Sequence, residues 1–92
     1  MSRSADRDLS GIIGYTINEW GKRKAKAYAD QIRLTISKIA ESPLQSPHEV
    51  VEGVAYKKRL SGHHLIYAQV TGDELFVSRI LHEKMDAARH LN

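Results

Sequence analysis

Residues 9–40 read LSGIIGYTINEWGKRKAKAYADQIRLTISKIA, and this stretch decides the fold. In its first half, apolar side chains recur at the three- and four-residue spacing of one face of an α-helix. These positions are Leu9, Ile12, Ile13, Thr16, Ile17 and Trp20. The second half repeats the pattern at Ala25, Tyr28, Ala29, Ile32, Ile36, Ile39 and Ala40. We therefore predict two consecutive amphipathic helices.

The ends of both helices carry sequence signals. Ser4 is a candidate N-cap for the first helix, and Asp6 and Asp8 lie in its first turn, where the helix dipole favours negative charge. Gly21 directly follows the first apolar stripe and can adopt the left-handed conformation that ends a helix. Pro43 ends the second helix, because the residue before a proline is disfavoured in helical geometry. Helices joined this closely are expected to pack antiparallel, as a hairpin.

The period changes in the second half of the chain. Residues 42–49 contain two prolines and are predicted to form a loop. Three short runs rich in β-branched and aromatic residues then predict strands. These runs are residues 54–60, 64–70 and 75–80, and glycine-containing turns at 61–63 and 71–74 separate them. Such short links predict an antiparallel meander of three strands.

Together these elements predict one α+β domain, residues 1–92, in which the helical hairpin packs on a three-stranded antiparallel sheet. Leu65, Tyr67, Phe76 and Ile80 are candidates for the sheet's side of the core, although their alternation does not fix which set points inward. The last residues, 81–92, are expected to form a short helix or an ordered tail.

Composition excludes several classes of protein. The chain of 92 residues is too short for a second core, and its 41% hydrophobic content is that of a globular domain. It contains 0 cysteines, which excludes a disulfide scaffold and a thiol nucleophile. No apolar run approaches the ~18 residues of a membrane span, and the first residues lack the apolar segment of a signal peptide. We therefore expect a cytoplasmic protein without a membrane association.

The formal net charge of +3 is modest, but its cations are clustered. One cluster comprises Lys22, Arg23, Lys24 and Lys26, and a second spans residues 57–59. Each cluster is either a solvated face or a contact for phosphate groups, since clustered cations release the counterions that drive nucleic-acid binding.

The histidines do not predict a metal site. His63 and His64 are adjacent at the start of a strand, where neighbouring side chains tend to point to opposite faces. The other histidines lack ligand spacing, and no phosphate-binding glycine-rich loop occurs, so we expect neither a metal nor a cofactor. His64, Arg79 and His82 could instead converge as the acid, base and cation of a ribonuclease. Ordinary structural roles for these residues are the alternative.

Two residues point away from the apolar stripes of the helices. Tyr15 falls nearly opposite the first stripe, and Leu34 lies about 180° from the second by the ~100° per residue of an α-helix. A single exposed residue of this kind is ordinary, but the two together suggest an interface with a partner.

An ordered set of short segments runs through nearly the whole chain: ADRDL at 5–9, Trp20-Gly21, Ala25 and Tyr28, IAESP at 39–43, GHHLIY at 62–67 and RILHEKMD at 79–86. With these segments the chain resembles the ParE branch of the RelE/ParE superfamily, the toxins of type II toxin–antitoxin modules. The resemblance implies a helical hairpin on an antiparallel sheet. It also implies a non-enzymatic protein that poisons DNA gyrase and forms a hetero-oligomer with a cognate ParD-like antitoxin.

The resemblance also suggests which residues make these contacts. Toxicity is assigned to the C-terminal stretch, with target contacts at Arg79, His82, Lys84, Met85 and Arg89. Antitoxin contacts are expected on the helices, at Tyr15, Tyr28, Ile32 and Leu34. A flexible partner that orders itself on a preformed groove would explain such a surface.

Two alternatives remain. The RelE branch cuts messenger RNA on the ribosome with strand cations and a C-terminal tyrosine. Here no tyrosine occurs in residues 82–92, and His64 replaces the usual central-strand arginine, which disfavours an endoribonuclease. The other alternative is an inactive homologue that only binds antitoxin and takes part in operon autoregulation.

The family usually has a short strand before the first helix, and only Met1, Ser2 and Arg3 precede Ser4 here. That strand is expected to be missing or reduced, unless the natural start lies upstream. An open sheet edge or groove would follow, and with it a greater reliance on the antitoxin or on self-association.

Overall fold

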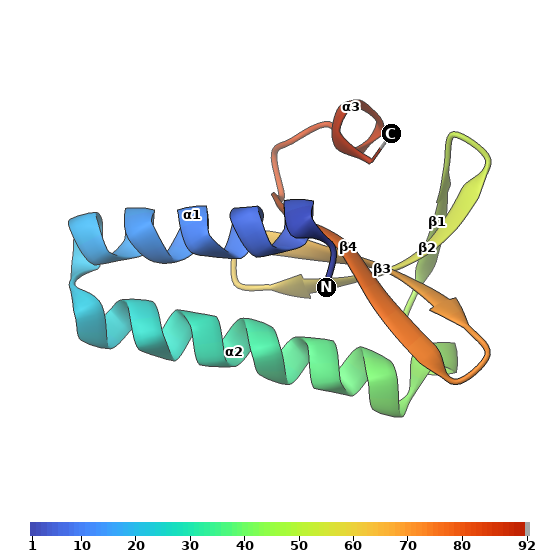
Figure 1. Cartoon of the computed structure of the whole chain (residues 1–92), viewed down its shortest axis with the longest axis horizontal. Helices are drawn as coiled ribbons and strands as arrows, with labels where there is room; N and C mark the ends of the chain where they lie inside the picture. The colour runs from blue at the N-terminus through green and yellow to red at the C-terminus, as the bar shows by residue number, and fades with distance from the viewer. Residues whose placement is uncertain (92) are drawn as a thin grey trace.

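The computed structural model describes residues 1–91. Two long helices lie antiparallel along one face of a twisted sheet, and a short helix near the C-terminus packs on the other face (Figure 1). The elements are α1 (Arg3–Trp20), α2 (Lys22–Glu41), the short 3₁₀ helix η1 (Pro43–Gln45), β1 (His48–Val51), β2 (Val54–Ser61), β3 (His64–Thr71), β4 (Glu74–His82) and α3 (Ala87–His90). The predicted hairpin on an antiparallel sheet is therefore confirmed.

The helix boundaries follow the sequence signals, with two corrections, at Asp8 and at the N-cap. Because α1 begins at Arg3, only Asp6 lies in its first turn, and Asp8 lies beyond it. Gly21 has a φ of 91° and donates its N–H to the carbonyl of Ile17, which ends α1. Ser42 ends α2 immediately before Pro43, as expected. The N-cap of α1 is Ser2 rather than Ser4, because the Ser2 hydroxyl accepts the N–H of Ala5 at 2.9 Å. Ser4 lies inside the first turn.

The sheet has four strands in the order β1-β2-β3-β4, all antiparallel. The prediction of three strands was wrong, because residues 48–51 pair with Val54–Lys57 across a tight turn. In that turn, Glu52 and Gly53 both have positive φ, 51° and 79°, as a two-residue type I′ hairpin requires. The loop predicted for residues 42–49 therefore ends two residues early and contains η1.

Each face of the sheet carries a hydrophobic cluster. Toward α1 and α2, a core forms around Leu9, Ile32, Ile39, Ile66 and Ile80. On the opposite face, a second cluster contains Val51, Tyr56, Tyr67 and Leu81, and residues of the α3 region pack against it. Of the four residues proposed for the sheet's side of the hairpin core, only Ile80 belongs there. Leu65 and Tyr67 belong to the second cluster instead, because both faces of the sheet carry apolar side chains. Phe76 belongs to neither cluster and is 49% exposed.

The outer edge of β4 is occupied by the start of the chain rather than by a strand. The N–H of Ser2 donates to the carbonyl of Val77 at 2.9 Å, and the Ser2 hydroxyl donates to the carbonyl of Ser78 at 2.6 Å. The residue before α1 therefore provides donors for two carbonyl groups of the β4 edge, which we expected to be open.

The tip of the helical hairpin extends beyond the sheet (Figure 1). Consequently Trp20, assigned by its spacing to the core-facing stripe, is 64% exposed, and Ile17 is 37% exposed. The periodicity correctly identified a face of the helix, but the sheet is too short to cover the end of that face. Leu9, Ile12 and Ile13 do pack on the core.

Candidate partner-binding groove

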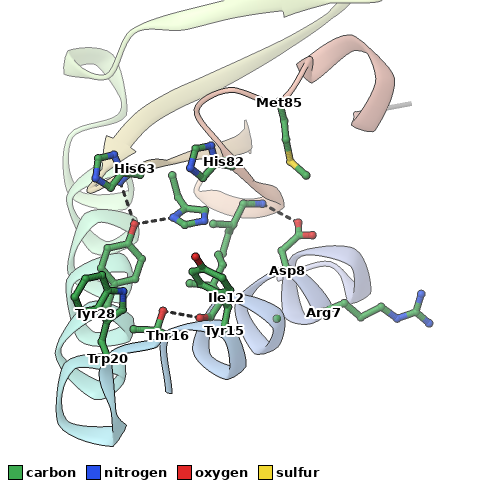
Figure 2. Close-up of a pocket in the computed structure, with 13 residues that line it drawn as sticks. Arg7, Asp8, Ile12, Tyr15, Thr16, Trp20, Tyr28, His63, His82 and Met85 are labelled. Carbon is green, nitrogen blue, oxygen red and sulfur yellow. Dashed lines mark hydrogen bonds between the residues drawn. The ribbon is translucent and has the colours of Figure 1, made fainter. Parts of the chain in front are cut away.

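A groove of about 680 Å³ lies between α1, the start of α2 and the ends of the strands (Figure 2). Its lining comes from Arg7, Asp8, Gly11, Ile12, Tyr15, Thr16, Trp20, Tyr28, His63, His64, Ile80, His82 and Met85. Tyr15, Trp20 and Met85 are about half to two thirds exposed, at 65%, 64% and 48%. The groove therefore offers large apolar side chains at its rim and histidines and a tyrosine at its floor.

Helical spacing aligns one side of the groove. Asp8, Gly11, Ile12 and Tyr15 lie three and four residues apart, and so they share one face of α1. An added Cβ at Gly11 would meet nothing within 4 Å, which shows that the groove is open at this point. Ile12 also packs on the core, so the groove face of α1 adjoins the core-facing stripe, while Tyr15 stands out from it at 65% exposure.

Tyr28 connects α2 to the turn between β2 and β3. Its hydroxyl accepts the N–H of His63 at 3.0 Å, and it lies 3.2 Å from the carbonyl of Ser61 and 2.6 Å from Nδ1 of His64. Gly62 makes this approach possible, because a Cβ at that position would lie 2.5 Å from the Tyr28 ring. The Gly62-His63-His64 segment is therefore shaped around one tyrosine.

Three imidazoles gather at the floor of the groove. The ring centroids of His64 and His82 are 5.4 Å apart, and those of His63 and His82 are 6.3 Å apart with nearly parallel planes. The expectation that His63 and His64 point to opposite faces was wrong. His63 lies in the turn, before β3 begins, so the alternation of a strand does not apply to it.

Burial makes His64 a weaker base than an ordinary histidine. Its pKa lies below the usual value of 6.5, chiefly because burial disfavours the charged ring and secondarily because His82 and His63 are close. Glu83 and Asp8 oppose this lowering of the pKa. Nδ1 of His82 accepts the backbone N–H of Lys84 at 3.2 Å. Within residues 1–91, no group of three or more His, Cys, Asp or Glu residues is arranged to hold a metal ion.

Arg79 is engaged within the chain and does not join the histidines. Its Nε and Nη2 atoms donate to the two carboxylate oxygens of Asp8 at 2.7 and 2.8 Å, and Nη1 donates to the carbonyl of His90 at 2.8 Å. The hydrogen bonds to Asp8 raise the pKa of Arg79 further, so it is permanently charged. The structure therefore brings together His64 and His82, but not the cation of the ribonuclease hypothesis.

The remaining predicted contacts divide by position. Tyr15 and Tyr28 line the groove, whereas Leu34, 56% exposed, does not, and Ile32 is fully buried in the core. Ile32 therefore presents no side chain to a partner in this conformation. Lys84, Met85 and Arg89 are exposed on the segment that links β4 to α3 and on α3 itself, and only Met85 reaches the groove.

Sequence reasoning missed three residues that shape this site. Asp8 was interpreted as a helix-dipole residue, and Trp20 as a core residue. Gly62 was interpreted only as a turn residue. A signal existed for Trp20, since a stripe that continues to the last residue of a helix can run past the sheet that covers it. Nothing in the sequence alone pairs Asp8 with Arg79, because they are separated by 71 positions.

The fold and groove define a small α+β protein with a preformed groove that large apolar side chains rim. Residues 1–87 match the family described as the ParE toxin of the type II toxin–antitoxin system parDE, and the chain belongs to this family. It is 36% identical over 92 residues to Toxin ParE1 of Caulobacter vibrioides, covering 99% of this chain and 94% of that protein. It is 30% identical over 93 residues to Toxin ParE of Escherichia coli, covering 99% and 89% respectively.

A solved structure supports the fold independently. A chain from the chromosomal ParDE toxin–antitoxin system of P. aeruginosa superposes with a TM-score of 0.75 at 19% sequence identity, covering 88% of this chain and 89% of that one. The hairpin-on-sheet fold is thus shared despite the low identity. No helix within residues 1–91 is long and apolar enough to cross a membrane.

Proposed function

We propose that this toxin acts as a non-enzymatic poison of DNA gyrase, and that direct binding of a ParD-like antitoxin neutralises it. The observation that carries the proposal is the family match over residues 1–87. The target itself is inferred from the family resemblance. We assign the groove to the antitoxin and the exposed C-terminal segment to the target, and the two surfaces overlap at His82 and Met85.

The groove suits an amphipathic segment of the antitoxin. Tyr15, Trp20 and Met85 expose large apolar side chains around a hollow of about 680 Å³, and a partner helix or strand would bury them. A disordered antitoxin segment that folds into the groove would convert this apolar burial into affinity. Leu34 belongs to the contact surface only if the partner also reaches the outer side of α2.

The C-terminal segment suits the target. Lys84, Met85 and Arg89 are exposed, and they combine two cations with a flexible apolar side chain, as a protein–DNA complex would require. Of the other two residues predicted to contact the target, we keep His82, which lines the groove. We remove Arg79, because its N–H groups already donate to Asp8 and to the carbonyl of His90. Met85 belongs to both surfaces. An antitoxin seated in the groove would therefore cover part of the target contact.

The endoribonuclease alternative has weaker support. His64 and His82 are close enough to act as a base and an acid, but each has Nδ1 engaged by a neighbour, Tyr28 or the Lys84 N–H. Arg79 cannot stabilise a scissile phosphate while it is paired with Asp8. The remaining alternative is an inactive homologue that retains only antitoxin binding and operon autoregulation.

One pair of assays separates these functions. The purified toxin should inhibit supercoiling by gyrase and cause cleaved plasmid to accumulate, while leaving mRNA intact in a translating extract. Lys84→Ala/Met85→Ala should raise the toxin concentration needed, whereas Arg33→Ala/Leu34→Ala on the outer side of α2 should not. Unchanged supercoiling at a large molar excess of folded toxin would exclude gyrase as the target.

A second experiment tests the groove as the antitoxin site. Tyr15→Lys places a charge at the apolar rim and should weaken binding of the co-encoded antitoxin by tenfold or more, about 1.4 kcal/mol. Leu34→Lys makes the same change outside the groove and should leave the affinity near that of the native chain. Equal losses in both variants would show that the partner is not centred on the groove.

A further inference from the structure

The tip of the α1–α2 hairpin carries a concentrated positive charge that the proposed function does not use. Lys22, Arg23 and Lys24 are consecutive, all are exposed, and they form the first turn of α2. Lys26 pairs with Asp30 at 2.9 Å, and Lys24 Nζ lies 5.1 Å from the centre of the Trp20 ring. Among residues 1–91, no carboxylate forms an ion pair with Lys22 or Arg23.

Folding does not account for this placement of charge. The start of a helix favours acidic side chains, because the helix dipole is positive there, and the first turn of α2 contains none. Three adjacent cations also repel one another. Lys22 and Arg23 therefore do not stabilise the hairpin through an ion pair. An anion outside the chain is left as their partner.

The shape of the tip restricts what that anion can be. The tip projects beyond the sheet (Figure 1), Trp20 is 64% exposed, and a Cβ at Gly21 would meet nothing within 4 Å. Lys22, Arg23 and Lys24 do not line the groove beside Trp20. An acidic segment seated in that groove would therefore not neutralise them. A row of backbone phosphates on a duplex does present itself to a convex basic surface.

We propose that this basic tip, formed by Trp20, Lys22, Arg23 and Lys24, binds the phosphate backbone of duplex DNA without sequence preference. Each cation neutralises a phosphate and releases condensed counterions, which makes the binding strongly dependent on salt. Trp20 holds the Lys24 ammonium against its ring and so fixes one of the three charges. This contact goes beyond the proposed function, because it requires neither gyrase nor antitoxin.

Fluorescence anisotropy of a labelled mixed-sequence duplex, titrated with the full-length toxin, tests the proposal. About three phosphate contacts predict a slope of about −2.7 for log K against log salt, or a loss of about 40-fold in affinity between about 50 and 200 mM. Lys22→Gln/Arg23→Gln should reduce the slope to about −0.9 and the loss to about fourfold. Both replaced side chains are exposed, and circular dichroism should show an unchanged fold.

The opposite ends of the same two helices provide the control. Arg3→Gln/Lys38→Gln removes the same net charge, but from the first turn of α1 and the last turn of α2, away from the tip. This variant should keep the slope of the native chain. Equal slopes for the native chain and the tip variant would overturn the proposal.

Two further outcomes would also overturn it. In the first, the toxin binds phosphatidylserine vesicles but not the duplex, and in the second, it binds polyglutamate but not the duplex. Either result would assign the tip to another class of partner. All of these measurements omit gyrase, so their failure leaves the supercoiling assay as a separate test of the proposed target.

Discussion

Asp8 and Arg79 form a two-pronged ion pair that joins the first helix to the last strand. The guanidinium donates to both carboxylate oxygens, and Oδ2 of Asp8 also accepts the backbone N–H of Ile80 at 2.9 Å. β4 is an edge strand, so Asp8 satisfies a donor that no other strand reaches. Because Arg79 also donates to the carbonyl of His90, one residue pair fixes α1, β4 and the α3 region together.

The first prediction concerns this pair. Asp8→Ala should lower the free energy of unfolding by about 2–3 kcal/mol, because it leaves a mostly buried guanidinium and a backbone N–H without their acceptor. The Asp8 and Arg79 side chains are 15% and 23% exposed, which keeps the loss below that of a fully buried pair. Asp6→Ala, at an exposed position in the first turn of the same helix, should cost about 0.5 kcal/mol or less. Urea unfolding measures both.

A double-mutant cycle decides whether the pair itself is responsible. Asp8→Ala, Arg79→Ala and the double variant should give a coupling energy of at least about 1 kcal/mol. Additive losses would mean that each residue stabilises the fold through other contacts.

The second prediction compares two glycines in equivalent turns. Gly62 and Gly72 have nearly the same φ, 59° and 61°, so an alanine is strained at either position. Gly72→Ala meets no other atom within 4 Å and should cost about 1–2 kcal/mol. Gly62→Ala should cost about 1–3 kcal/mol more, because its Cβ would displace the Tyr28 ring from its hydrogen bonds. Equal losses in thermal or urea unfolding would show that the Tyr28 contact is readily relieved.

The third prediction is a stabilising change. Glu52 has a φ of 51°, a conformation that asparagine tolerates better than glutamate, and it precedes Gly53 in a two-residue turn. Glu52→Asn should raise the free energy of unfolding by about 0.5–1 kcal/mol. Asp73→Asn, in a turn where only Gly72 has positive φ, should change it little. A lack of gain from Glu52→Asn would indicate that the Glu52 side chain makes a compensating contribution.

Local patterns predicted the helices, their hairpin and the last three strands, because spacing, Gly21 and Pro43 act within a few residues. The pattern missed β1, since residues 48–51 are short and follow a proline, and their pairing depends on a turn with an unusual glutamate. The strand prediction also assumed that only one face of the sheet is buried. Residues of the α3 region pack on the other face, and for this reason Leu65 and Tyr67 were assigned to the wrong cluster.

The site was less predictable than the fold, because its residues come from opposite ends of the chain. Tyr15 could be recognised as outward-facing from helical spacing alone. The convergence of Tyr28, His63 and His82 depends on the strand register, in which His64 faces His82. The role of Arg79 depends on Asp8, which only the packing of α1 against β4 brings into contact.

The final prediction concerns pH. The folded state lowers the pKa of His64 below 6.5, through burial first and then through His82 and His63, while Glu83 and Asp8 act in the opposite direction. As the pH falls through about 6.5, His64 therefore becomes protonated in the unfolded chain while it stays neutral in the folded chain. The free energy of unfolding should decline from that pH down to the lower pKa of the folded state, and then this contribution should level off.

His64→Gln removes the titrating ring, so its free energy of unfolding should decline less between pH 7 and pH 5, a range of about two units around the unfolded pKa. His48→Gln provides the matched control, because His48 is exposed in β1 and lies outside the groove. Urea unfolding at a series of pH values measures the slope for each protein. If His64→Gln and His48→Gln decline in parallel with the native chain, the His64 imidazole is not the source of the pH dependence.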